Sequence, residues 1–178
     1  MTSQTAVIIV NYGAGPLLTR CLASLEAQSQ KPRRVILVDN ASPDLDASAI
    51  ERRFPWVEVV ALGENLGFAA ANNLAVRLAS DCTWVALLNP DAFAHRGWLA
   101  ALEAAARDYP RFSFFASRQD MAGAPGFLDG TGDAYHVSGM AWRRGHGAPG
   151  THAPAQAQEV FGACAAAASG PTTSTTTV

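Results

Sequence analysis

Short apolar runs alternate along the chain with segments in which apolar residues recur every three or four positions. Such runs are typical of strands, and the three-to-four spacing is typical of helices. Strands are predicted at residues 6–10, 35–38, 57–60, 84–88 and 112–116. Helices are predicted at residues 17–25, 45–54, 69–78 and 98–109. Because the runs at residues 6–10, 35–38 and 84–88 are apolar throughout, the pattern predicts an α/β fold: an open, mostly parallel sheet with helices on both faces.

A different pattern begins at residue 118. Residues 118–158 hold eight glycines, which favours a long, loop-rich region with short strands near residues 134–143. Residues 160–166 are apolar again and are predicted to return to the sheet. Residues 169–178 contain five threonines and no charged residue, so they are interpreted as a polar tail.

The composition is that of one soluble domain. The chain has 178 residues, 49% hydrophobic and 16% charged, so it can bury a sizeable core. A formal net charge of -2 and the lack of a basic run disfavour nucleic-acid binding. No apolar run approaches the roughly 18 residues of a transmembrane segment. The first residues do not resemble a signal peptide, so the sequence predicts a cytoplasmic protein. The three cysteines match no metal or redox spacing and are expected to be reduced thiols: Cys21, Cys82 and Cys164.

Polar side chains follow three of the predicted strands. They are Asn11 after the first strand, Asp39, Asn40 and Ser42 after the second, and Asn89 and Asp91 after the fourth. Ligands of open parallel sheets bind beyond the carboxyl ends of the strands, so these side chains are expected to share one crevice. One carboxylate there can accept hydrogen bonds from a base or ribose. Another can hold Mg²⁺ or Mn²⁺, which leaves coordination positions for a diphosphate. Together they describe a nucleotide site.

Each of these residues also has a simpler interpretation. Asp39 lies in a segment that suits a turn or a helix cap, Asp91 follows a proline and can cap a helix, and residues 64–68 can form a turn before a helix. A dinucleotide-binding protein of the Rossmann type is a further alternative. It is disfavoured because Gly13 and Gly15 lack the third glycine that its fingerprint requires.

Five segments, taken in order, resemble the amino-terminal part of family 2 glycosyltransferases. They are residues 7–12, 38–44, 63–73, 87–91 and 160–164. The resemblance spans residues 6–168 and points to the rhamnosyltransferase-like branch. It implies the nucleotide-sugar-binding α/β fold called GT-A, incomplete at the C-terminus. By this resemblance the chain divides into a nucleotide-sugar-binding unit, an acceptor-side region of the same domain and a tail outside the family, at residues 1–117, 118–168 and 169–178.

The resemblance also implies which residues bind the donor. In that family the aspartate of the second segment contacts the nucleoside, and the Asn-Leu-Gly-Phe loop lies near the nucleotide and the sugar. The nucleotide-sugar-binding residues expected from this are Asn11, Tyr12, Asp39, Asn40, Ser42, Asn65, Gly67, Phe68, Asn72 and Asn89. Asn89 stands in place of the first acid of the family's Asp-x-Asp metal motif, which leaves Asp91 as the chief protein ligand of Mg²⁺ or Mn²⁺.

The implied reaction is the inverting transfer of a sugar from a nucleotide diphosphate sugar to a carbohydrate or other acceptor hydroxyl. The family's general base lies in an acidic motif further along, and no segment here matches that motif. The late acids Asp129, Asp133 and Glu159 are not assigned as the base. A catalytically inactive, truncated nucleotide-sugar-binding protein is therefore the alternative to an active transferase.

Two features of the later region bear on partners. Trp142 beside Arg143 and Arg144 fits an acceptor groove, and a half-exposed edge strand explains it equally well. An exposed sheet edge would also allow the chain to form an oligomer. The sequence does not identify the donor sugar, the base or the acceptor.

Overall fold

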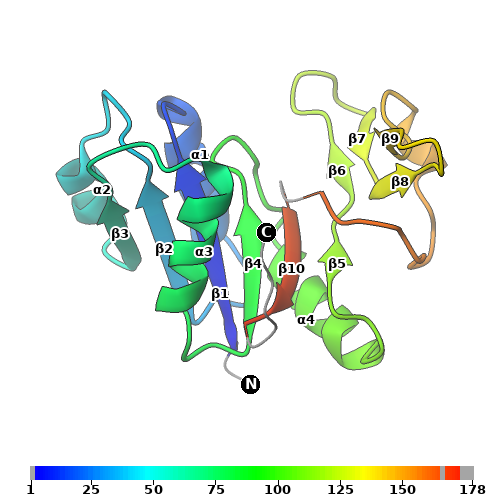
Figure 1. The fold of residues 1–178 in the computed structure, drawn as a ribbon, viewed down its shortest axis with the longest axis horizontal. Coiled ribbons are helices and arrows are strands. Elements are labelled where there is room, and N and C mark those ends of the chain that lie inside the picture. The colour runs from blue at the N-terminus through cyan, green and yellow to red at the C-terminus, as the bar shows by residue number, and fades with distance from the viewer. Residues whose placement is uncertain (1–2, 165–166, 173–178) are drawn as a thin grey trace.

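A six-stranded sheet runs through the centre of the computed structural model, which describes residues 3–164 and 167–172 (Figure 1). Its strand order is β3-β2-β1-β4-β10-β5. The strands are β1 (Thr5–Asn11), β2 (Arg34–Asp39), β3 (Val57–Ala61), β4 (Trp84–Leu88), β5 (Phe115–Ala116) and β10 (Ala167–Pro171). The helices are α1 (Pro16–Glu26), α2 (Ala47–Arg53), α3 (Phe68–Leu78) and α4 (Trp98–Asp108).

The first four strands are parallel. β1 pairs with β2 on one side and β4 on the other, and β2 pairs with β3. β10 runs antiparallel between β4 and β5. The predicted α/β fold with a mostly parallel sheet is therefore confirmed.

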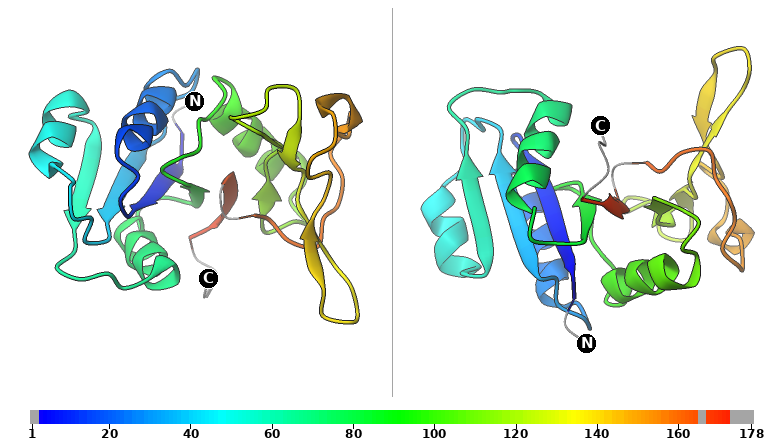
Figure 2. Two further views of the ribbon diagram at one scale, coloured as in Figure 1. Left: turned by 90° about the horizontal axis from the view of Figure 1, so that it is seen from above. Right: turned by 60° about the horizontal axis from the view of Figure 1, so that its bottom comes forward.

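Helices cover both faces of the sheet, as predicted. Figure 2 shows α3 on one face and α1 and α4 on the other. Alternate residues of β1 supply the two cores: Val7 and Ile9 pack with α1, α2 and α4, while Ile8 packs with α3. This burial on both sides explains why the strand runs are apolar throughout.

The last strand differs from the prediction. Residues 160–164 do not return to the sheet, and residues 165–166 lie outside the described residues. The last strand of the sheet is β10. Ser169, Gly170 and Pro171 therefore belong to the sheet and not to the predicted polar tail. The pattern missed β10 because its small residues carry no β-branched or aromatic side chain. Residues 173–178 of the predicted tail lie outside the described residues.

The strand predicted at residues 112–116 is shorter than expected. Only Phe115–Ala116 form β5, because β10 offers backbone partners to these two residues alone. The glycine-rich region beyond holds β6 (Gln119–Asp120), β7 (Leu128–Gly130), β8 (Asp133–Tyr135), β9 (Ala141–Arg143) and a short 3₁₀ turn, η1 (Gly150–His152). The β8–β9 hairpin confirms the short strands predicted near residues 134–143.

The glycine-rich region extends beyond β5, at the opposite end of the molecule from β3 (Figure 1). Its two hairpins pair β6 with β7 and β8 with β9, separately from the central sheet. Within the part of the chain that is described, no helix has the length and apolar character needed to cross a membrane.

Candidate functional site

The carboxyl ends of β1 and β2 bring three of the predicted side chains together. Asn11 and Asp39 are direct neighbours in the parallel register of these strands. The Asn11 amide nitrogen donates to Asp39 Oδ1 at 3.2 Å and to Ser42 Oγ at 2.9 Å. Ser42 in turn donates through its hydroxyl to Asp39 Oδ1 and through its backbone N–H to Asp39 Oδ2. We call Asn11, Asp39 and Ser42 the strand-end cluster.

The strand-end cluster is buried and keeps free acceptor capacity. Asn11 is 1% exposed and Asp39 7% exposed, and Asp39 forms no ion pair among the described residues. Asn11 Oδ1 is buried and accepts no hydrogen bond from a described residue. Buried oxygen atoms in proteins almost always have a donor, so this atom is suited to accept one from a bound molecule.

The second strand end is tied to the loop before α3. Asn40 Nδ2 donates to Asn65 Oδ1 at 2.8 Å, and Asn40 Oδ1 accepts from the Leu66 backbone N–H at 2.9 Å. Asn65 Oδ1 also accepts from the Gly67 N–H, and Gly67 has a φ of 79°, a conformation that favours glycine. Asn40 is thus a bridge that fixes the loop beside the strand-end cluster.

Three other predicted residues flank this loop and differ in exposure. The side chains of Tyr12 and Phe68 are exposed at the ends of β1 and the loop, so both rings are open to a ligand. Asn72 is buried instead, and its amide nitrogen donates to the Phe68 carbonyl four residues earlier in α3. Asn72 therefore supports the first turn of α3 rather than facing the crevice.

Asp91 lies in the segment that begins at the carboxyl end of β4. The Cys21 thiol of α1 donates to the Asn89 carbonyl at 3.4 Å and so holds the start of this segment. Burial, and then the nearby charge of Asp91, raise the pKa of Cys21 to about 12. Cys21 consequently remains a neutral thiol donor at physiological pH.

Two further side chains, Ser24 in α1 and Gln28 just after its end, hold the same segment, and their role could not be seen in the sequence. Ser24 Oγ accepts from the Ala94 N–H at 3.0 Å, and Gln28 Nε2 donates to the His95 carbonyl at 2.8 Å. Gln28 Oε1 accepts from the Leu99 N–H at 3.1 Å, which satisfies the first turn of α4. We call Cys21, Ser24 and Gln28 the α1 clamp.

A sequence feature could have pointed to the α1 clamp. Its members recur every three or four residues: Cys21 and Ser24 lie in the helix predicted at residues 17–25, and Gln28 lies three residues beyond it. Ser24 and Gln28 are unexpectedly polar for positions that continue the apolar stripe of that helix. A polar residue on a core-facing stripe needs a partner, but the sequence does not say that the partner is a segment about 70 residues away.

The described residues fit a metal that takes only part of its coordination from protein. No group of three His, Cys, Asp or Glu side chains capable of holding a metal occurs within residues 3–164 and 167–172. Asp91 is exposed and forms no salt bridge to a described residue. One free carboxylate suits Mg²⁺ or Mn²⁺, because these ions readily keep water and phosphate oxygens as their other ligands.

The family model of glycosyl transferase family 2 matches residues 6–129. An N-acetylglucosaminyl-diphospho-decaprenol L-rhamnosyltransferase of Mycobacterium tuberculosis is 36% identical over 121 residues, which cover 62% of this chain and 39% of the relative. The chain thus spans about two fifths of that relative's length.

Solved structures give the same result. A mannosyltransferase of Pyrobaculum calidifontis in complex with GDP-Man and Mn²⁺ matches with a TM-score of 0.60 and 28% identity, over 67% of this chain and 36% of that chain. TarS 1–349 of S. aureus in complex with UDP-GlcNAc matches with a TM-score of 0.59 and 22% identity, over 70% of this chain and 36% of that chain, and supports the fold. The alternative of a Rossmann-type dinucleotide-binding protein is therefore not supported. The motif order, the strand-end cluster and the family match agree, and the chain belongs to glycosyl transferase family 2.

Proposed function

We propose that this chain binds a nucleotide diphosphate sugar together with Mg²⁺ or Mn²⁺ and supplies the donor half of an inverting glycosyltransferase site. The observation that carries the proposal is the strand-end cluster, in which Asn11 Oδ1 is buried without a donor. Its position at the carboxyl ends of parallel strands is where ligands of open α/β sheets bind.

The nucleoside is assigned to the strand-end cluster. Asp39 has acceptor capacity left on Oδ2 after the contacts from Asn11 and Ser42, and this oxygen can accept from a base or a ribose hydroxyl. The exposed ring of Tyr12 offers a flat face to the base. Asn65, Gly67 and Phe68, fixed by Asn40, border the same ligand.

Asp91, supported through Asn89 by the α1 clamp, would hold the metal ion. When bound, Mg²⁺ or Mn²⁺ would neutralise the charge that develops on the departing diphosphate. The protein would hold the Asp91 carboxylate in place before the donor binds, which lowers the entropy cost of forming the metal site.

The acceptor is proposed to be a hydroxyl group of a carbohydrate. The relative from Mycobacterium tuberculosis is a rhamnosyltransferase whose name gives an N-acetylglucosaminyl-diphospho-lipid as its acceptor. Attack by a hydroxyl requires a general base to remove its proton. Asp129 is engaged by Arg143 and His146 and is poorly placed for that role.

Calorimetric titration of the chain with UDP, GDP and dTDP, each with and without Mn²⁺, tests the proposal. We expect metal-dependent binding of at least one nucleotide, weakened about tenfold or more by Asp39→Asn and by Asp91→Asn, since each removes a charge-assisted contact. The matched control is Asp108→Asn, at an exposed carboxylate at the end of α4. Binding that is absent, or that is equal in all three variants, would refute the proposed function.

A further inference from the structure

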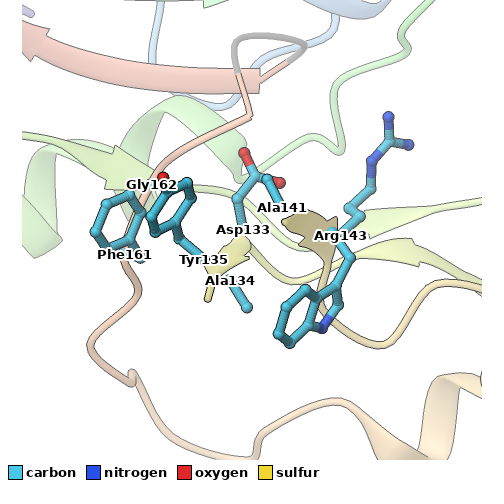
Figure 3. Close-up of a pocket in the computed structure, with 8 residues that line it drawn as sticks. Asp133, Ala134, Tyr135, Ala141, Arg143, Phe161 and Gly162 are labelled. Atoms are coloured by element: carbon cyan, nitrogen blue, oxygen red, sulfur yellow. The ribbon is translucent and has the colours of Figure 1, made fainter. Parts of the chain in front are cut away.

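A pocket of about 440 Å³ lies in the glycine-rich region, away from the carboxyl ends of β1, β2 and β4 (Figures 1 and 3). Its walls come from the β8–β9 hairpin and from the segment that precedes β10. The side chains and backbone that matter are Asp133, Tyr135, Trp142, Arg143, Phe161 and Gly162. None of these residues belongs to the predicted donor site.

Aromatic rings form one wall of the pocket. The rings of Tyr135 and Phe161 stack with their centroids 5.1 Å apart and an angle of 17° between their planes. Although each ring covers one face of the other, Tyr135 is 52% exposed and Phe161 70% exposed. Trp142, which also borders the pocket, is 52% exposed. Solvent-exposed aromatic side chains gathered at one pocket are typical of a binding surface.

Backbone contacts hold this wall in place. The Asp133 N–H donates to the Gly162 carbonyl at 3.0 Å, which fastens the residue next to Phe161 onto β8. A Cβ atom at Gly132 would lie 2.7 Å from a Val160 methyl group, so glycine is required where these segments meet. The segment that carries Phe161 is therefore held against the start of β8, which carries Tyr135.

A carboxylate stands beside the aromatic wall. The antiparallel register pairs Asp133 with Arg143 and Tyr135 with Ala141, which places Asp133, Tyr135 and Arg143 on one face of the hairpin. Figure 3 shows the Asp133 carboxylate between the stacked rings and the Arg143 side chain. Arg143 donates to Asp129 at 2.6 Å, whereas Asp133 forms no side-chain hydrogen bond or ion pair with a described residue.

We propose that this pocket is a carbohydrate-binding subsite that holds one sugar ring of the acceptor. The C–H face of a pyranose packs on the negatively polarised face of an aromatic ring. The ring's hydroxyl groups donate to the free oxygens of Asp133. The acceptor role rests on the proposed transferase function, whereas sugar binding by the pocket does not.

The same residues disfavour other occupants. A phosphate or other anion would be repelled by Asp133, because Arg143, its partner across the hairpin, is already paired with Asp129. A lipid chain would cover Asp133 without offering it a donor, which is costly for a carboxylate. A neutral ligand with many hydroxyl groups satisfies both the rings and the carboxylate.

Saturation-transfer NMR on the full chain, without nucleotide or metal, tests the proposal. The probes are the methyl glycosides of glucose, galactose, mannose, rhamnose and N-acetylglucosamine. We expect saturation of the ring protons of at least one probe. Tyr135→Ala, Phe161→Ala and the conservative Asp133→Asn should each weaken its binding by about tenfold. The controls are Tyr109→Ala and Asp108→Asn, at an exposed tyrosine and an exposed aspartate near the end of α4.

Other results would overturn the inference. No saturation of any probe would exclude a sugar subsite, as would equal binding by the pocket variants and the controls. Binding to phosphatidylglycerol vesicles, or dimerisation, that depends on Phe161 in the absence of sugar binding would assign the pocket to a lipid surface or a second copy. Sugar binding without nucleotide binding would leave the subsite standing while the proposed transferase function fails.

Discussion

Gln28 is the member of the α1 clamp whose substitution should lower the free energy of unfolding most. Its side chain is buried and connects α1 with both the segment after β4 and the start of α4. Gly97, at the N-cap of α4, has no side chain to satisfy the first turn, and Gln28 Oε1 does so from the turn that follows α1. We therefore expect Gln28→Ala to destabilise the fold.

The size of the effect follows from the groups left behind. The Leu99 N–H is buried and loses its acceptor, which costs about 1–3 kcal/mol. The His95 carbonyl still accepts from the Trp98 N–H at 2.8 Å, so losing its bond from Gln28 adds little. Removing the buried side-chain atoms of Gln28 adds about 1 kcal/mol for the cavity. The free energy of unfolding should fall by about 2–4 kcal/mol in total.

Urea unfolding followed by circular dichroism measures this change through the midpoint, provided that the slope is unchanged. Gln158→Ala is the matched control, because Gln158 is exposed and its side chain accepts, among residues 3–164 and 167–172, from Arg144 alone. The same variant should bind Mn²⁺ with nucleotide less tightly, since the segment that carries Asp91 is no longer held. A loss of stability below about 0.5 kcal/mol would show that the Gln28 contacts do not stabilise this segment.

Three other places in the fold also give testable expectations. Maleimide at pH 8 should label Cys164 well before Cys21 in the folded protein, because the pKa of Cys21 is raised to about 12 and its thiolate is scarce. Mass spectrometry measures which cysteine is labelled first, and early labelling of Cys21 would contradict its burial. Ala41 has a φ of 62°, so Ala41→Gly should raise the free energy of unfolding by about 1 kcal/mol in urea unfolding, and destabilisation would argue against strain. Hydrogen bonding from Arg34 holds the pKa of Glu58 below its ordinary value, so the stability that this pair contributes is present at neutral pH and is lost as the pH falls below about 5. Arg34→Ala should flatten that acid-side loss in unfolding midpoints measured from pH 7 to pH 3, and an unchanged profile would exclude the pair as its source.

The parallel core could be predicted because the burial of each strand is visible in residues that are neighbours in the sequence. β1, β2 and β4 are buried on both faces, so each appears as an unbroken apolar run. The polar residues after these runs fall at the carboxyl ends of the strands. The pairing of Asn11 with Asp39 confirms that two of these strand ends meet.

The elements that the sequence did not reveal depend on distant partners. β10 has small residues that suit a strand only because β4 and β5 lie on either side of it. Gln28 and the Asn40 bridge are single polar residues whose partners lie far along the chain or in a loop. Side-chain pairing over such separations leaves no periodic pattern in the sequence.

The position of β10 inside the sheet also constrains the order of folding. β1 to β4 come from the first half of the chain and can pair as they are synthesised, whereas β10 joins only after residues 167–171 have emerged. Until then one side of β4 has unpaired backbone groups, and an unpaired strand edge of this kind attracts other chains. The late arrival of one short strand therefore sets how long this side of β4 can pair with other chains, and the pairing of β10 with β4 ends that period.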